Sequence, residues 1–267
     1  MRLKMLRLVS TRRYGISRLT ISISTSCTGQ CAYFLLQFTT MRSTELLTRF
    51  VWDSAFKNTG KWFPLEDSGV FALADITPAE TWAAMQKLLD SGKVHAIGVS
   101  NFTIKRLEDL LSAATTTVTP AVNQIEAHPY LQQPDLLQWC RDKNIVVTAY
   151  SPLGNNQTGE PKTVDDPLVQ ELGKELGLDG GQLLVSWGVQ RGTVVLPKSV
   201  TPSRIKSNLQ VSELSPRVYK QLNGLEKNKR FNWQTRWGCD IFQELGDAEA
   251  KRVAVEAAEE NKEKFTV

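Results

Sequence analysis

From residue 77 onward, short apolar runs rich in Val and Ile alternate with helical segments. This order constrains the fold more than any other feature of the sequence. Strands are predicted over 94–99, 121–125, 145–150 and 193–197, and helices over 103–114, 134–143, 165–190 and 201–211. Four strand-then-helix units in succession indicate parallel strands joined by crossover helices. The sequence therefore predicts an α/β fold built on a parallel sheet or barrel.

The helix before the first of these strands has clear boundary signals. Thr77-Pro78-Ala79-Glu80 is a capping box with proline at the first helical position, and Ser91-Gly92 is a stop signal. We expect the first strand to follow directly.

Composition excludes several classes of protein. The chain has 267 residues, of which 41% are hydrophobic, so it can bury a core. Its formal charge of +4 gives no sign of a nucleic-acid partner, and the longest apolar stretch of the first fifty residues, 31–36, is too short to cross a bilayer. The four scattered cysteines do not form the disulfide framework of a small secreted domain. We therefore expect a cytoplasmic location and no membrane partner.

The first fifty residues differ from the rest, because they hold eight basic side chains, one acidic side chain and fourteen Ser or Thr residues. A poorly ordered or loosely packed leader is expected there. A mitochondrial transit peptide, with a mitochondrial location, is the alternative that this composition leaves open. We divide the chain into a basic leader over 1–53, an α/β region over 54–245 and a charged, solvated C-terminal helix within 246–267.

Hydrogen-bonding side chains stand at the carboxyl ends of the predicted strands, where the chemistry of parallel α/β folds is placed. They stand in the segments Ser100-Asn101, Gln124-Ile125-Glu126, Tyr150-Ser151 and Lys198-Ser199. Asn and Gln amides match a carboxamide, and an aromatic face can stack on a planar ring. Lys198 and Arg204 add two cations near the start of a helix, as in an anion pocket. The set predicts a dinucleotide site without a Gly-rich loop. The alternative is that each side chain only satisfies a backbone end or cap.

Four sequence blocks carry a family resemblance. They are Gly98-Val99-Ser100-Asn101-Phe102, Val122-Asn123-Gln124-Ile125-Glu126, Ala149-Tyr150-Ser151-Pro152-Leu153-Gly154 and Leu196-Pro197-Lys198-Ser199-Val200-Thr201. In sequence and spacing they resemble the aldo-keto reductases over residues 54–245. The resemblance implies a TIM barrel that binds NADP(H) and reduces an aldehyde or ketone, the small-molecule partner, to an alcohol by hydride transfer.

The resemblance also implies roles for single residues. At the nicotinamide end of the cofactor, Ser100, Asn101 and Gln124 would hold the carboxamide, and Tyr150 would stack on the ring. Ser151 and Leu153 would line the pyrophosphate. At the other end, Lys198, Ser199 and Arg204 would bind the 2′-phosphate, and Asn208 would bind the adenine. Two cations at the ribose end favour NADP over NAD. Trp52 and Trp237 would contact the substrate, with packing as the alternative for Trp237.

The chain departs from the family at the catalytic groups. Family members place a Tyr, an Asp and a Lys on the first three strands and a His before the tryptophan that aligns with Trp52, but Val51 precedes Trp52 here. Tyr14 and Tyr33 lie in no matching context, so we assign no catalytic residue. The resemblance thus implies an incomplete barrel that corresponds to strands five to eight.

Two functions remain open. The chain is either an NADP(H)-dependent carbonyl reductase or a catalytically inactive, reductase-like NADP-binding or vestigial protein, because carbonyl reduction needs an acid beside the oxygen. An incomplete barrel also leaves two sheet edges unpaired. Either the leader or another chain, including a second copy associating through these edges, would cover the open face.

Metal binding is not expected. His95 and His128 are the two histidines and have no ligand cluster around them, so hydrogen-bonding or surface roles are predicted. Cys27 and Cys31 lack two further ligands at metal spacing.

Overall fold

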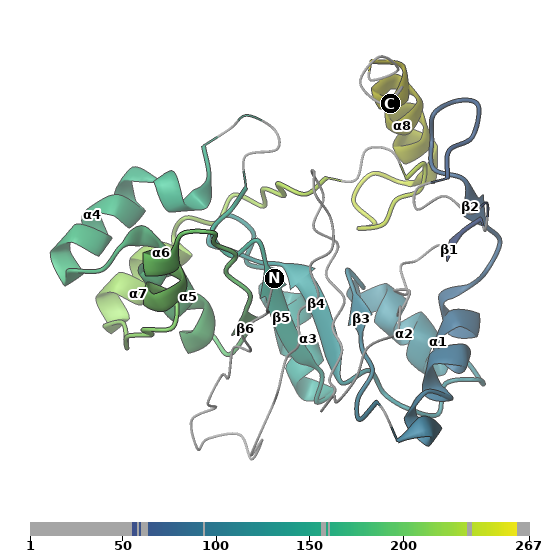
Figure 1. Cartoon of the computed structure of the whole chain (residues 1–267), viewed down its shortest axis with the longest axis horizontal. Helices are drawn as coiled ribbons and strands as arrows, with labels where there is room; N and C mark the ends of the chain where they lie inside the picture. The colour runs from purple at the N-terminus through teal and green to yellow at the C-terminus, as the bar shows by residue number, and fades with distance from the viewer. Residues whose placement is uncertain are drawn as a thin grey trace.

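A four-stranded parallel sheet forms the centre of the computed structural model (Figure 1). The structure describes residues 55–57, 59, 64–92, 94–155, 159, 161–233 and 237–260. The leader therefore lies outside the described residues, and so do Trp52 and the predictions made for it. Most of the α/β region of the sequence falls within them.

The strands of the sheet follow one another in chain order, β3 (Val99–Ser100), β4 (Val122–Glu126), β5 (Val146–Tyr150) and β6 (Val194–Val195). Every neighbouring pair is parallel, with Ser100 opposite Gln124 and Glu126 opposite Tyr150. The prediction of four parallel strands is confirmed. The arrangement agrees with part of a (β/α)8 barrel. In the described part of the chain, β3 and β6 are each paired on one side only, and these two strands are also shorter than predicted.

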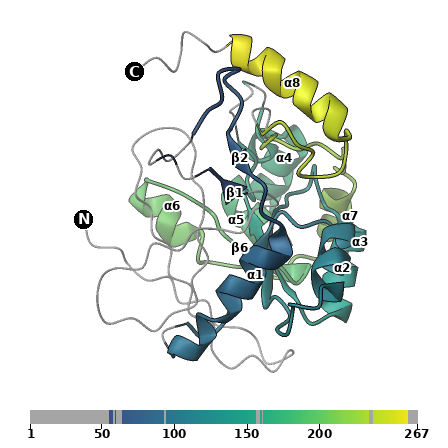
Figure 2. The same cartoon turned by 90° about the vertical axis from the view of Figure 1, so that its right-hand side faces the viewer.

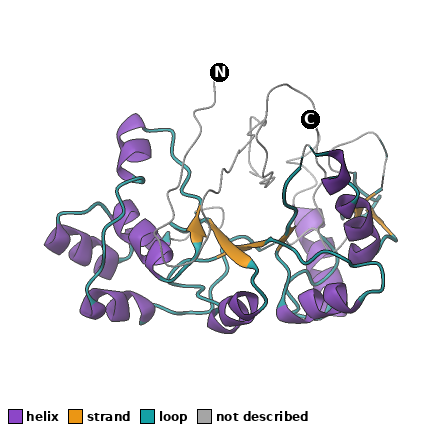
Figure 3. Cartoon of the chain, turned by 90° about the horizontal axis from the view of Figure 1, so that it is seen from below, coloured by secondary structure: helices purple, strands orange, loops and turns teal. Residues whose placement is uncertain are grey.

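The helix bounds follow the sequence signals closely. They are α1 (Pro78–Gln86), α2 (Ile104–Ser112), α3 (Pro134–Asp142), α4 (Pro167–Leu176), α5 (Gly180–Gln190), α6 (Pro202–Ser207), α7 (Pro216–Asn223) and α8 (Asp247–Glu260), with short 3-10 turns at Leu89–Ser91 and Thr163–Asp165. The Thr77 capping box is present, with Glu80 as its second member. Figure 1 shows α1 and α2 on the β3 side of the sheet and α4 to α7 on the β6 side, and Figure 3 shows the same division from below. The helix predicted over 201–211 is shorter, since α6 ends at Ser207.

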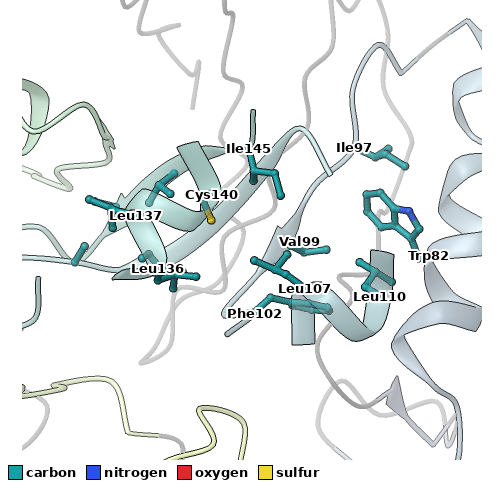
Figure 4. Close-up of a cluster of buried hydrophobic side chains, with 14 of the residues drawn as sticks. Trp82, Ile97, Val99, Phe102, Leu107, Leu110, Leu136, Leu137, Cys140 and Ile145 are labelled. Carbon is teal, nitrogen blue, oxygen red and sulfur yellow. The ribbon is translucent and has the colours of Figure 1, made fainter. Parts of the chain in front are cut away.

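The main hydrophobic core lies between the sheet and helices α1 to α3 (Figure 4). Trp82 of α1, Phe102 and Leu107 are almost completely buried in it. Because side chains alternate along a strand, Ile125 and Val147 face this core while their neighbours Gln124 and Thr148 face the opposite side of the sheet. The polar side chains at the strand ends therefore belong to the inner, barrel-side face.

That inner face changes in character along the strands. Near their amino ends, Val122, Val146 and Val194 pack together as a small apolar cluster. Toward the carboxyl ends, Gln124 and Glu126 replace them and are buried. The sheet is thus apolar at its base and polar at the edge where chemistry is expected.

The C-terminal helix α8 has one buried face. The sequence predicted a charged, solvated helix, but one face of α8 carries buried alanines at intervals of four residues, Ala250, Ala254 and Ala258. Ala258 packs beside Gly69, where an added Cβ would come within 3.0 Å of the Ala258 Cβ. Figures 1 and 2 both show α8 beside the small antiparallel pair of β1 (Ala55–Phe56) and β2 (Leu73–Ala74). Alanine side chains are short enough to let the helix approach this closely, which a polar-residue count does not reveal.

Candidate active site at the strand ends

The ends of β3 and β4 are joined by hydrogen bonds around one carbonyl. The backbone oxygen of Gln124 accepts from the Ser100 hydroxyl at 2.9 Å and from the Asn101 backbone N–H at 2.9 Å. Ser100, Asn101 and Gln124 are all buried, at 6%, 5% and 2% exposure. The structure therefore brings together the three residues that the sequence assigned to one carboxamide.

Tyr150 completes this group from the end of β5. Its hydroxyl donates a hydrogen bond of 3.0 Å to Asn101 Oδ1, so the two side chains span the end of the intervening strand β4. Burial first, and then the negative charge of Glu126, raise the pKa of Tyr150 above its ordinary value of 10. The hydroxyl thus remains a protonated donor at neutral pH and holds Asn101, whose φ of 62° is the left-handed conformation that asparagine tolerates.

The side-chain amide of Gln124 is the least satisfied group of the site. Its Nε2 is buried, and it has no hydrogen-bond partner among the described residues. A buried donor without an acceptor costs about 1 to 3 kcal/mol, so such groups usually have a reason to persist. A ligand that brings a carbonyl oxygen to this amide would supply the acceptor, and a nicotinamide carboxamide fits this donor set.

The loop after β5 is held against the C-terminal segment of the chain. Ser151, with a φ of 47°, accepts a hydrogen bond of 3.1 Å at its Oγ from the Asn232 side-chain amide. Leu153 packs against the hydrophobic cluster of α4 and α5, and its carbonyl accepts from the Val164 backbone N–H at 3.0 Å. The two residues assigned to the pyrophosphate are therefore next to each other in one fixed turn.

A group of polar and basic side chains follows β6. Ser199 accepts the Thr201 backbone N–H at 3.1 Å, and Asn208 is the C-cap of α6. Lys198 and Arg204 are exposed, and within the described ranges the side chain of neither forms a hydrogen bond or ion pair. Both cations remain available to an anionic ligand.

Trp237 lies within a hydrophobic cluster. It is 1% exposed and contacts Phe71 edge to face at a centroid distance of 5.5 Å, with Ile241 and Phe242 in the same cluster. The structure therefore gives Trp237 a packing role, which was the alternative to substrate contact in the sequence analysis. Substrate contact by Trp237 stays a prediction.

The sequence places Glu126 among the strand-end residues but assigns it no role in the site. This carboxylate is fully buried, and it accepts the backbone N–H groups of Phe231 at 2.8 Å and Asn232 at 3.0 Å. His128 Nε2 lies 2.9 Å from Glu126 Oε1, which gives the histidine the hydrogen-bonding role predicted for it. The sequence indicates that Glu126 is on the same face of the strand as Gln124, because the two residues are two positions apart.

Burial by itself would raise the pKa of Glu126. The hydrogen bonds from His128, Phe231 and Asn232 outweigh burial and hold this pKa below its ordinary value of 4.5. The carboxylate is therefore charged at neutral pH. It lies beside Tyr150 in the parallel register of β4 and β5.

No group of three or more His, Cys, Asp or Glu side chains in the described ranges is arranged to hold a metal ion. None of the described helices has both the length and the apolar character of a membrane-spanning helix.

Comparisons with known proteins point to one family. The family model of the Aldo/keto reductase family matches residues 52–227. Aldo-keto reductase family 1 member A1-A of Danio rerio is 41% identical over 187 residues, which cover 67% of this chain and 57% of the relative. Glycerol 2-dehydrogenase (NADP(+)) of Saccharomyces cerevisiae is 45% identical over 150 residues, which cover 56% of this chain and 47% of the relative.

The chain spans about half the length of these curated relatives. The matched residues include the four strands and every residue that the strand ends contribute to the site. On the family match and the parallel sheet together, the chain belongs to the aldo/keto reductase family.

Proposed function

We propose that this chain is an NADP(H)-dependent oxidoreductase of aldo-keto reductase type, whose strand ends hold the cofactor while an aldehyde or ketone is reduced. The buried, unpartnered Nε2 of Gln124 is the observation that carries this proposal. Gln124 is on β4, between the strand that ends at Ser100, with Asn101 directly after it, and the strand that ends at Tyr150. These three residues would complete a nicotinamide pocket. The names of two relatives support this choice of chemistry, because one is called an aldo-keto reductase and the other a dehydrogenase that uses NADP(+).

Each residue has a defined task in this proposal. Gln124 donates to the carboxamide oxygen, and Asn101, held by Tyr150, orients the opposite side of the same group. The phenol ring of Tyr150 supplies a flat surface for the nicotinamide, which when bound supplies the hydride. Lys198 and Arg204 attract the 2′-phosphate and so select NADP(H) over NAD(H).

A second candidate function is that the chain binds NADP(H) without turnover. The observation that favours it concerns the tyrosines. Reduction needs an acid near the carbonyl oxygen. The hydroxyl groups of Tyr130 and Tyr150 instead donate hydrogen bonds to the side chains of Asp166 and Asn101. The pKa of each tyrosine is raised above its ordinary value. Neither is prepared to protonate a substrate. The family's catalytic Tyr, Asp, Lys and His are not matched in the sequence.

Consumption of NADPH with a panel of small aldehydes separates the two functions. If the chain lacks the acid, we expect carbonyl reduction to be orders of magnitude slower than in a reductase with its full catalytic set. Robust turnover that disappears in Tyr14→Phe or Tyr33→Phe would identify a replacement acid upstream. Such a result would eliminate the second candidate.

A further inference from the structure

The carboxylate of Glu126 is buried on the inner face of the sheet, although the proposed chemistry assigns it no task. Three N–H donors converge on it, from His128 and from the backbone of Phe231 and Asn232. The backbone carbonyl of Glu126 accepts a fourth hydrogen bond, of 2.8 Å, from the Gln133 side chain. A charge buried with this many partners has a fixed position.

Two of those donors come from a segment more than 100 residues away in sequence. The segment 226–232 begins beside the loop after β4, where the Lys227 and Lys229 backbone N–H groups donate to the Tyr130 carbonyl at 3.2 and 2.8 Å. It ends at Glu126. Glu126 is therefore the point at which this segment is fastened to the carboxyl edge of the sheet.

Beyond that point, Asn232 makes side-chain contacts with the loop after β5. Its amide nitrogen donates to Ser151 Oγ at 3.1 Å, and its amide oxygen accepts from Asn155 Nδ2 at 2.5 Å. The backbone N–H of the same residue is held by Glu126. One residue thus connects the buried carboxylate to the turn that the proposed function assigns to the cofactor pyrophosphate.

We propose that Glu126 is a positioning residue, which fixes the segment 230–232 so that Asn232 holds Ser151 and its loop in the conformation that binds the cofactor pyrophosphate. This inference rests on the proposed function. Glu126 acts through Asn232 and need not touch the cofactor. Its charge matters because an ionised carboxylate accepts several N–H groups at once, whereas an amide in its place has one acceptor oxygen and introduces its own donors.

A double-mutant cycle tests this route. Glu126→Gln and Asn232→Ala are each expected to weaken NADPH binding by about threefold to tenfold, the size of one hydrogen bond to a charged or polar group. The double variant is expected to bind no more weakly than Glu126→Gln alone, because both changes break the same connection. Multiplied effects, or unchanged affinity in Glu126→Gln, would overturn the proposal.

The matched control is Glu226→Gln. Glu226 also fastens this segment through backbone N–H groups, from Gln132, Lys227 and Asn228, but it is exposed and lies at the far end from Ser151. Its NADPH affinity is expected to stay within about twofold of wild type. An equal loss in this variant would show that any loosening of the segment weakens binding and that Glu126 has no special position.

Tryptic cleavage provides a readout that does not depend on the cofactor. Glu126→Gln should be cut faster after Lys229 and Arg230 than wild type, while Asn232→Ala, which keeps the Glu126 contacts, should not. Unchanged cleavage in Glu126→Gln contradicts the proposal, even if the wild type binds no NADPH. Faster cleavage in this variant, together with no NADPH binding by the wild type, supports the attachment of the segment by Glu126 and rejects the proposed function. If Glu126→Gln does not fold, Glu126→Asp, which keeps the charge but shortens the side chain, takes its place with the same expectations.

Discussion

Gly154 lies against Phe231, so that a Cβ added to the glycine would come within 3.0 Å of the Phe231 Cε2 atom. The same Cβ would come within 2.6 Å of the Thr163 backbone nitrogen. Gly154 also has a φ of 73°, which side chains disfavour. The turn after β5 can therefore pack on the C-terminal segment only if this residue has no side chain.

Gly154→Ala is predicted to destabilise the protein by about 2 to 4 kcal/mol, because positive φ and a backbone clash act together. Gly177→Ala is the control, since Gly177 has a φ of 67° but nothing within 4 Å of an added Cβ. It should lose only about 1 kcal/mol. Chemical denaturation gives both values. Equal losses would show that packing against Phe231 and Thr163 contributes nothing.

Gln124→Met is expected to separate stability from binding. The substitution keeps the length of the side chain and removes the unpartnered buried amide, so the free energy of unfolding should stay equal or rise by about 1 kcal/mol. NADPH affinity should fall at least about tenfold. Denaturation and a binding titration on the same preparation check the pair. A large loss of stability would mean that the amide has a structural role instead.

The stability contributed by Glu126 should depend on pH. Its pKa is lower in the folded chain than its ordinary value of 4.5, so its contribution is fully present above about pH 4.5 and is lost as the pH falls through the folded value. The stability difference between wild type and Glu126→Gln should therefore shrink on acidification below about pH 4.5. Urea denaturation between neutral and acidic pH measures it. A difference that stays constant over this range would contradict the contribution of the charge.

Arg204→Ala should weaken NADPH binding by about 1 to 3 kcal/mol and change NADH binding little, since only NADPH carries the 2′-phosphate. Arg217→Ala is the control, because Arg217 is another exposed arginine but pairs with Glu175 on a different helix. It should leave both affinities unchanged. Equal loss of NADPH and NADH affinity in Arg204→Ala would indicate a general structural role for that side chain.

The regular part of the sequence predicted most of the fold. The four strands and their polar ends follow from alternating patterns and capping signals that act locally, as at Thr77 and Glu80. The docking of α8 was not predictable in the same way, because Ala258 has no partner in its own sequence neighbourhood and meets Gly69 only in three dimensions. Sequence patterns therefore predict single helices and strands well, but they predict contacts between distant elements poorly.

The candidate site shows the same division. Asn101, Gln124 and Tyr150 could be predicted because each lies at the carboxyl end of its own strand. The role of Glu126 depends on Phe231 and Asn232, which no spacing rule connects to it. The side chain could be placed on the inner face, but its partners could not.

Calorimetric titration of the folded wild-type chain with NADPH shows whether the strand ends bind the cofactor. We expect saturable binding at one site, with NADPH bound at least about tenfold more tightly than NADH because of the additional phosphate contact. Absence of saturable NADPH binding to chain that denaturation shows to be folded would contradict the assignment of the strand ends to the cofactor.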